Sequence, residues 1–196
     1  MPGVLLDEPL DGLYRHWLGK RRGRAMPCRA DIDPLEIPGE IWPHTMLLDV
    51  LWAGDRPRFR YRRVGDVFWR GGGQEPTGKF IDEVLPERAG YRAYVLGIYE
   101  ETATRRRPMF TENSFALEGC RTAMSTRRVT LPLSSDGARV NMVLSGHVFE
   151  HGKLAREQAF ALICSLKELR RVVLEEQLPA ARRQPSVLPC PVDAES

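Results

Sequence analysis

The sequence predicts an α+β protein with a five-stranded antiparallel sheet, helices on one face of the sheet, and flanking helices at both ends. Two short apolar stretches, 46–52 and 59–64, surround a polar turn, as the strands of a β-hairpin do. A helical apolar pattern then occupies residues 87–105, and three strand-like stretches follow before residue 150. Strands and helices that are segregated in this way favour an antiparallel sheet with its helices packed against it.

The composition is that of an ordinary soluble protein with one buried core. The chain has 196 residues, of which 42% are hydrophobic and 28% charged, and its formal net charge is +3. Arginines alternate with acids, so no nucleic-acid partner is predicted, and no apolar stretch reaches the ~18–20 residues of a membrane-spanning helix. The four cysteines are scattered, which predicts neither a zinc site nor a disulfide framework. We therefore expect a reduced, cytoplasmic protein.

Residues 1–40 are expected to form an N-terminal helix followed by an irregular extension. Apolar side chains recur at helical spacing near the start of the chain, which predicts an amphipathic helix. They are Leu10, Leu13, Tyr14, Trp17 and Leu18. Acids precede this stretch and the basic run 20–22 ends it, as the helix dipole favours. Prolines and aspartates in residues 26–34 then predict irregular chain.

Residues 41–150 are expected to form the sheet domain. The predicted strands are residues 46–52, 59–64, 109–118, 122–133 and 138–149. Between the second and third strands, residues 80–85 predict a short helix, and residues 87–105 predict a longer one. In the last strand, alternation places Gly146 on one face of the sheet, and Ser145 and His147 on the other.

Residues 151–178 are expected to form a C-terminal amphipathic helix, and residues 179–196 a disordered tail with four prolines. Apolar residues in the first segment alternate steps of four and three, which is heptad spacing. This spacing predicts a seam for a second copy of the chain or a protein partner. The seam residues are Leu162, Leu166, Leu169 and Val173.

The order of elements and a set of short motifs are similar to a bacterial PAS-like family whose members begin with a Tyr-x-x-Trp helix and an Asp-Ile-Asp-Pro segment. The matching segments are residues 14–17, 27, 31–34, 47–50, 58–62, 64–65, 77–78, 107–108, 131–134 and 136–137. Arg63 and Asp66 depart from the apolar residue and the Thr or Ser that the family usually carries there. The resemblance implies a sensory or protein-interaction fold, with no fixed cofactor and no catalytic residues.

Motifs that would indicate catalysis or a resident cofactor are incomplete. Residues 73–79 match the spacing of a phosphate loop, but Phe80 stands where Ser or Thr would hold magnesium. Neither His44 nor His147 lies in a predicted helix, where haem-binding PAS relatives carry their axial ligand. Cys120 lacks the sequence context of a flavin-reactive cysteine. We therefore predict no enzyme, no metal site and no cofactor.

Aromatic, aliphatic and methionine side chains of the sheet domain predict a cavity between the sheet and its helices. The candidate lining residues are Phe68, Phe80, Tyr91, Tyr94, Val95, Ile98, Phe115, Met124 and Met142. A filled core uses the same residue types, so both alternatives stay open.

The expected function is that of a non-catalytic sensory or regulatory protein of PAS type, which binds a small, unidentified ligand. Binding would order residues 68–85, change the packing of the terminal helix, and so alter contact with a signalling partner. The alternative is a ligand-free adaptor that forms a homodimer along the heptad seam.

Overall fold

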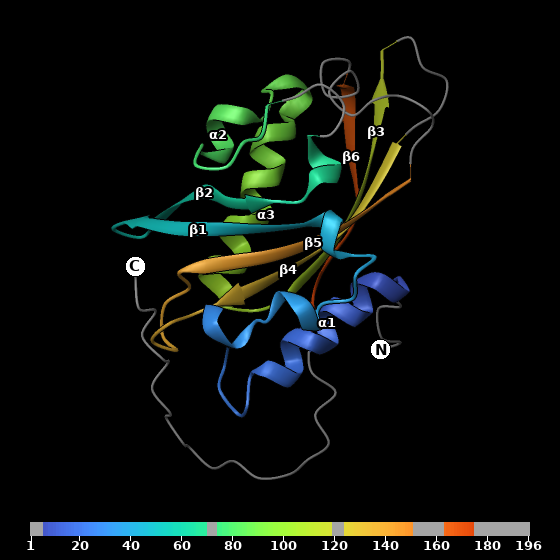
Figure 1. The fold of residues 1–196 in the computed structure, drawn as a ribbon. Helices are drawn as coiled ribbons and strands as arrows, with labels where there is room; N and C mark the ends of the chain where they lie inside the picture. Colours follow the sequence, from blue (N-terminus) through green and yellow to red (C-terminus); the bar gives the residue numbers. More distant parts are fainter. Residues whose placement is uncertain (1–5, 70–73, 119–123, 151–162, 175–196) are drawn as a thin grey trace.

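Six strands pair into one antiparallel sheet in the order β2-β1-β5-β4-β3-β6 (Figure 1). This computed structural model describes residues 6–69, 74–118, 124–150 and 163–174. The strands are β1 Thr45–Ala53, β2 Arg56–Val64, β3 Met109–Leu117, β4 Met124–Leu133, β5 Met142–Glu150 and β6 Ile163–Val173. The helices are α1 Glu8–Lys20, α2 Ile81–Val84 and α3 Tyr91–Arg105, with short 3-10 turns between them. The α+β class and the antiparallel sheet are confirmed.

The first five strands lie close to where the sequence predicts them. The β1–β2 hairpin closes with a two-residue turn, in which Gly54 has a φ of 62°. A left-handed conformation of this kind suits glycine, which has no Cβ to clash with the backbone. β1 also pairs with β5, so the hairpin joins directly to the three later strands.

The predicted C-terminal helix is wrong over residues 163–173, which form strand β6 at the edge of the sheet. β6 pairs with β3 from Met109 to Leu117 and gives that strand a second hydrogen-bonded neighbour. A register shift between Glu112 and Asn113 adds an extra residue to β6. This bulge interrupts the alternation of inward and outward side chains along β6. The apolar residues of β6 are therefore spaced as they would be in a helix. The residues that the structure describes form six strands instead of the predicted five.

Helix α1 packs on one face of the sheet, across β4 and β5. Its buried residues are Leu10, Leu13 and Trp17, which belong to the stripe that the sequence predicts. Trp17 Nε1 donates a hydrogen bond to the carbonyl of Pro132 at 2.9 Å. Gly146 lies beneath the helix, since a Cβ at that position would approach Leu13 Cδ2 to 2.5 Å. The first helix thus packs on its own sheet, a point that the sequence leaves open.

Helix α3 covers the opposite face together with α2, so the two helices of the sheet domain share one face, as predicted, and the flanking helix α1 lies on the other (Figure 1). Thr102 of α3 shares a hydrogen bond of 2.6 Å with Thr130 of β4, and both side chains are buried. The helix begins at Tyr91 and not at residue 87, because Ala89 and Gly90 have positive φ angles. It ends at Arg105, and the capping residue Arg106 is also left-handed.

The described helices include none that is both long and apolar enough to cross a membrane. Cys28 takes part in a disulfide, so the expectation of reduced cysteines is wrong for this residue. Cys164 on β6 is a free, exposed thiol.

Candidate functional site

A cavity of about 70 Å³ lies on the α3 face of the sheet and is partly open to the surface. Its walls come from β1, β2, α2, α3, β4 and β5, and from the 3-10 turn Asp66–Phe68. Most of the wall is apolar or aromatic, and Arg128 and His147 supply a polar end. We call this space the interior cavity.

Three of the nine predicted lining residues, Phe68, Tyr91 and Val95, line the interior cavity. Sequence reasoning did not include the other lining residues. These are Met46, Tyr61, Val64, Pro76, Val84, Leu85, Tyr99, Arg128 and His147. Tyr61 belongs to the aromatic set of the domain, but only the strand register shows that it faces the same space as His147.

The other six predicted lining residues do not line the cavity, and one of them, Tyr94 of α3, is half-buried. Ile98, Phe115 and Met124 are buried in the core, and alternation places Met142 on the face that α1 covers. Phe80 lies at the edge of the sheet beneath the Arg58 guanidinium, which is 3.5 Å from the ring centroid.

Four side chains at the polar end form a hydrogen-bonded chain. Arg128 Nε donates to His147 Nδ1 at 3.2 Å, and His147 Nε2 lies 3.1 Å from Ser145 Oγ. Ser145 Oγ in turn lies 3.3 Å from the Tyr99 hydroxyl on α3. Because Nδ1 accepts a hydrogen bond from Arg128, the proton of a neutral His147 belongs on Nε2, which then donates to Ser145.

Arg128 is deeply buried, with only 3% of its surface exposed. Its Nη1 atom has no hydrogen-bond partner, and no carboxylate of the described residues lies within ion-pair distance of it. The neighbouring Arg127, on the opposite face, is ion-paired with Asp7 at 3.0 Å and also with Glu150. Arg127 is therefore neutralised by carboxylates, whereas Arg128 has no carboxylate partner among the described residues.

Further buried polar atoms without partners lie on the same face. Thr111 of β3 is directly opposite Arg128 in the sheet, and Asn113 is two residues further along β3. Thr111 Oγ1, both amide atoms of Asn113 and the Tyr94 hydroxyl have no hydrogen-bond partner among the described residues. Burial raises the pKa of Tyr94 to about 12. Native proteins leave few such atoms unpaired, so this group of buried polar atoms is an unusual feature of the α3 face.

Phe68 closes the cavity beside its polar end. Its ring lies edge-on to His147, with the ring centroids 4.9 Å apart. The chain reaches Phe68 through Gly65, where a Cβ would come within 2.0 Å of the Pro43 carbonyl oxygen. Only glycine permits this close approach of two backbone segments, and it fixes where the turn bearing Phe68 begins.

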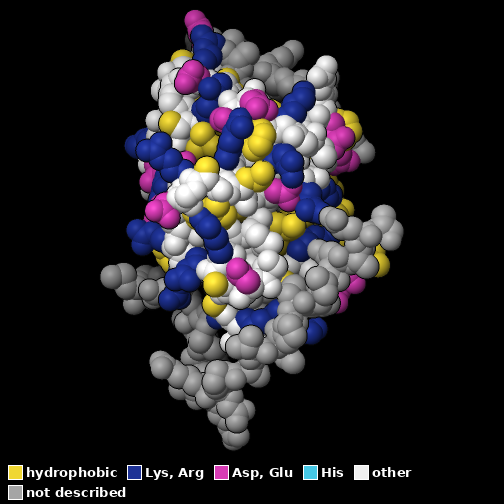
Figure 2. Space-filling view, turned by 90° about the vertical axis from the view of Figure 1, so that its left-hand side faces the viewer, with side chains coloured by type: hydrophobic (Ala, Val, Ile, Leu, Met, Phe, Trp, Pro, Cys, Tyr) yellow, Lys and Arg dark blue, Asp and Glu magenta, His cyan; other side chains and the backbone are white. Residues whose placement is uncertain are grey.

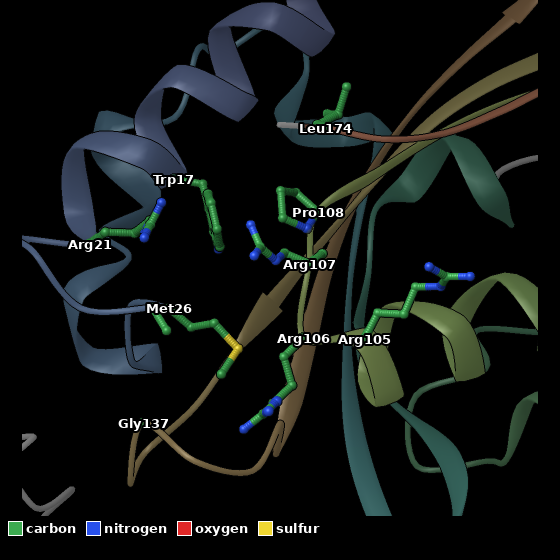
Figure 3. A pocket seen from close by; sticks show the side chains of 10 residues that line it. Trp17, Arg21, Met26, Arg105, Arg106, Arg107, Pro108, Gly137 and Leu174 are labelled. Atoms are coloured by element: carbon green, nitrogen blue, oxygen red, sulfur yellow. The ribbon is translucent and has the colours of Figure 1, made fainter. Parts of the chain in front are cut away.

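A second, larger hollow of about 390 Å³ lies at the surface between α1, the end of α3 and the β4–β5 turn (Figure 3). We call it the arginine cleft. Its lining includes Arg21, Arg105, Arg106 and Arg107 over an apolar floor that contains Trp17. Among the described residues, no acidic side chain lines it.

The arginines of this cleft are largely engaged or exposed. Arg105 pairs with Glu101 at 2.8 Å, and Arg106 donates to a backbone carbonyl at 3.1 Å. Arg107 is exposed and points toward Trp17 (Figure 3). Burial, and then the nearby charge of Arg107, lower the pKa of Arg21. Exposed arginines are hydrated by water, so charge in the cleft costs less free energy than the buried charge of Arg128.

Elsewhere on the surface, basic side chains are spread among acidic ones. Figure 2 shows this mixture on the side of the molecule that carries the β1–β2 hairpin. On β2, Arg60 and Arg62 both pair with Asp49, and Arg58 pairs with Asp82 and Glu83.

The fold and the site define the class as an α+β protein with a six-stranded antiparallel sheet and a small, partly polar cavity on one face. No protein-family model, curated protein or solved structure matches this chain significantly.

Proposed function

We propose that this chain is a non-catalytic sensory protein of PAS type, which binds a small ligand in the interior cavity. The observation that carries the proposal is the cavity itself, which has apolar walls and a buried polar end at Arg128 and His147. Ligand sites commonly combine these two features, since the apolar wall gives affinity and the few polar groups give orientation. The order of the first five strands and their helices also supports it, because this order carries the PAS-like resemblance.

The contacts around the cavity suggest how binding would be transmitted. Both Phe68 and α3 line the cavity, and α3 is joined to the edge strand β6 by an ion pair between Glu101 and Arg171 at 2.9 Å. A ligand that favours one position of α3 would therefore alter β6, where a signalling partner would detect the change. The mechanism is a shift in population between two packings and needs no chemical step. In this proposal β6 takes the place of the C-terminal helix.

The alternative, a ligand-free dimeric adaptor, has less support. Its heptad seam requires a helix, whereas Leu166, Leu169 and Val173 lie on strand β6. Leu166 packs against the core, and Leu169 is 48% exposed. Leu162 lies outside the described residues. A homodimer remains an outcome that the experiment below can detect.

Native mass spectrometry of the purified full chain tests both functions, because it reports bound ligand and subunit number together. We expect a co-purified small molecule, or a saturable rise in the thermal midpoint with a member of a metabolite set. A ligand at 100 times its dissociation constant should add about 2.7 kcal/mol to the free energy of unfolding.

Two variants of α3 test whether the ligand binds in the interior cavity. Val95→Met adds volume inside the interior cavity, whereas Leu96→Met changes the next residue, which does not line it. We expect Val95→Met to abolish ligand retention and Leu96→Met to preserve it. A ligand-free chain with no response to any compound, or equal retention in both variants, would contradict the proposal.

A further inference from the structure

The most unusual group of the molecule is the guanidinium of Arg128, which is charged and almost fully buried. Removing an ion from water costs several kcal/mol unless an opposite charge or several hydrogen bonds replace the water. Arg24, Arg127 and Arg171 are less buried, yet each is ion-paired with at least one carboxylate. Arg128 is the most buried of the four, and His147 is its only hydrogen-bond partner among the residues that the structure describes.

The donor that Arg128 leaves over at this end of the cavity suits a carboxylate. Arg128 Nε is already engaged with His147, so Nη1 is the buried donor that remains. Thr111 Oγ1 and Asn113 Nδ2 lie on the strand that pairs with Arg128 and also have no partner among the described residues, but they do not line the cavity. A carboxylate accepts about four hydrogen bonds through its two oxygens. Its negative charge would also balance the positive charge of the Arg128 guanidinium.

The volume of the cavity favours a small ligand. About 70 Å³ is several times the ~10–15 Å³ that one water needs, so a carboxylate and a short aliphatic chain fit beside Arg128. The walls that would surround this chain include Met46, Val64 and Val95. Among the lining residues that the structure describes, Arg128 is the sole Lys or Arg, so a second carboxylate would have no partner.

We propose that the ligand of the interior cavity is a short-chain aliphatic monocarboxylate whose carboxylate pairs with Arg128. This inference rests on the proposed function, because it names the ligand class of the same cavity.

The test compares acids with a neutral analogue on the full, unaltered chain. Calorimetric titrations with acetate, propionate, butyrate and octanoate are made at matched ionic strength, together with butyramide. We expect propionate or butyrate to bind at least tenfold more tightly than butyramide, and octanoate not to bind. Because a buried ion pair is weakly screened, this affinity should change little when sodium chloride is added.

Two variants distinguish the interior cavity from the arginine cleft. Arg128→Gln should reduce butyrate affinity at least tenfold, whereas Arg107→Gln, in the cleft, should leave it unchanged. If Arg128→Gln does not fold, the comparison of butyrate with butyramide on the unaltered chain still decides the question.

Each contrary result has its own meaning. Equal binding of butyrate and butyramide would overturn the carboxylate assignment and leave the proposed sensor intact. Loss of binding in Arg107→Gln alone, or a steep decrease with salt, would place the anion in the arginine cleft and also overturn it. If no acid binds while Val95→Met still removes another ligand, the carboxylate assignment is wrong and the proposed sensory function is retained.

Discussion

The contact between α1 and the sheet depends on the absence of a side chain at Gly146. A methyl group there would lie 2.5 Å from Leu13 Cδ2, closer than a Cβ contact allows. Its next neighbours, Leu10 and Val129, would be 3.4 and 3.6 Å away, at ordinary contact distance. Leu13 is therefore the sole described residue that a Gly146→Ala substitution displaces. This geometry makes the pair suitable for a double-mutant cycle.

The magnitudes follow from this packing. Leu13 is fully buried, so Leu13→Ala should lower the free energy of unfolding by about 2–5 kcal/mol. Gly146→Ala should lower it by about 1–2 kcal/mol, since overpacking is partly relieved by movement of a side-chain end. In the Leu13→Ala background the clash is absent, and the added methyl should stabilise by about 1 kcal/mol through burial and a less flexible unfolded chain. The expected coupling energy is therefore about 2–3 kcal/mol.

Urea unfolding followed by circular dichroism, on the wild type and the three variants, measures this coupling. Leu35→Ala serves as a control, because Leu35 is 93% exposed and should change stability by less than about 0.5 kcal/mol. Additivity of the two substitutions to within about 0.5 kcal/mol would mean that α1 does not pack over Gly146.

Three further predictions concern a close approach and two titratable groups. Gly65→Ala should lower the free energy of unfolding by about 3 kcal/mol in urea denaturation, because its Cβ would meet the Pro43 carbonyl oxygen, whereas Gly39→Ala, in open space, should be nearly neutral. Backbone N–H groups that donate to Asp136 hold the pKa of its carboxyl below the usual range, so its stabilisation is present at neutral pH and lost as pH falls below about 4; Asp136→Ala should remove this acid-dependent part. Burial raises the pKa of Tyr94 to about 12, because the folded state disfavours the phenolate. The free energy of unfolding should therefore not depend on this group below pH ~10 and should fall as pH rises toward 12, and urea unfolding of Tyr94→Phe should show no such alkaline decline.

Local sequence patterns predicted the elements whose formation depends on near neighbours. The spacing of Leu10, Leu13 and Trp17 gave the buried face of α1, and the apolar stretches gave five strands near their observed places. In contrast, β6 forms because β3 has a free edge, and this edge lies some fifty residues away in sequence. Tertiary pairing of this kind overrides a helical apolar spacing, so the strand was missed.

The polar end of the cavity could not be predicted for a related reason. Alternation within β5 placed Ser145 and His147 on the same face, and this prediction agrees with their hydrogen bond. The partnership of His147 with Arg128 depends on the register between β4 and β5, which no local pattern specifies. Arg128 is also one of two consecutive arginines, 127 and 128, and such a pair is expected to be exposed when the strand pairing is unknown.

The same two strands carry both the packing of α1 and the candidate site, on alternate residues. Val129 and Gly146 face α1, whereas Arg128 and His147 face the interior cavity. Because successive side chains of a strand point to opposite faces, substitutions beneath α1 should change stability without reaching the ligand. We therefore expect Leu13→Ala to lower the thermal midpoint while the dissociation constant for butyrate stays within about twofold, well below the tenfold that corresponds to 1.4 kcal/mol. If Leu13→Ala also greatly weakened butyrate binding, the packing of α1 on one face would be coupled to the cavity on the other face through the sheet.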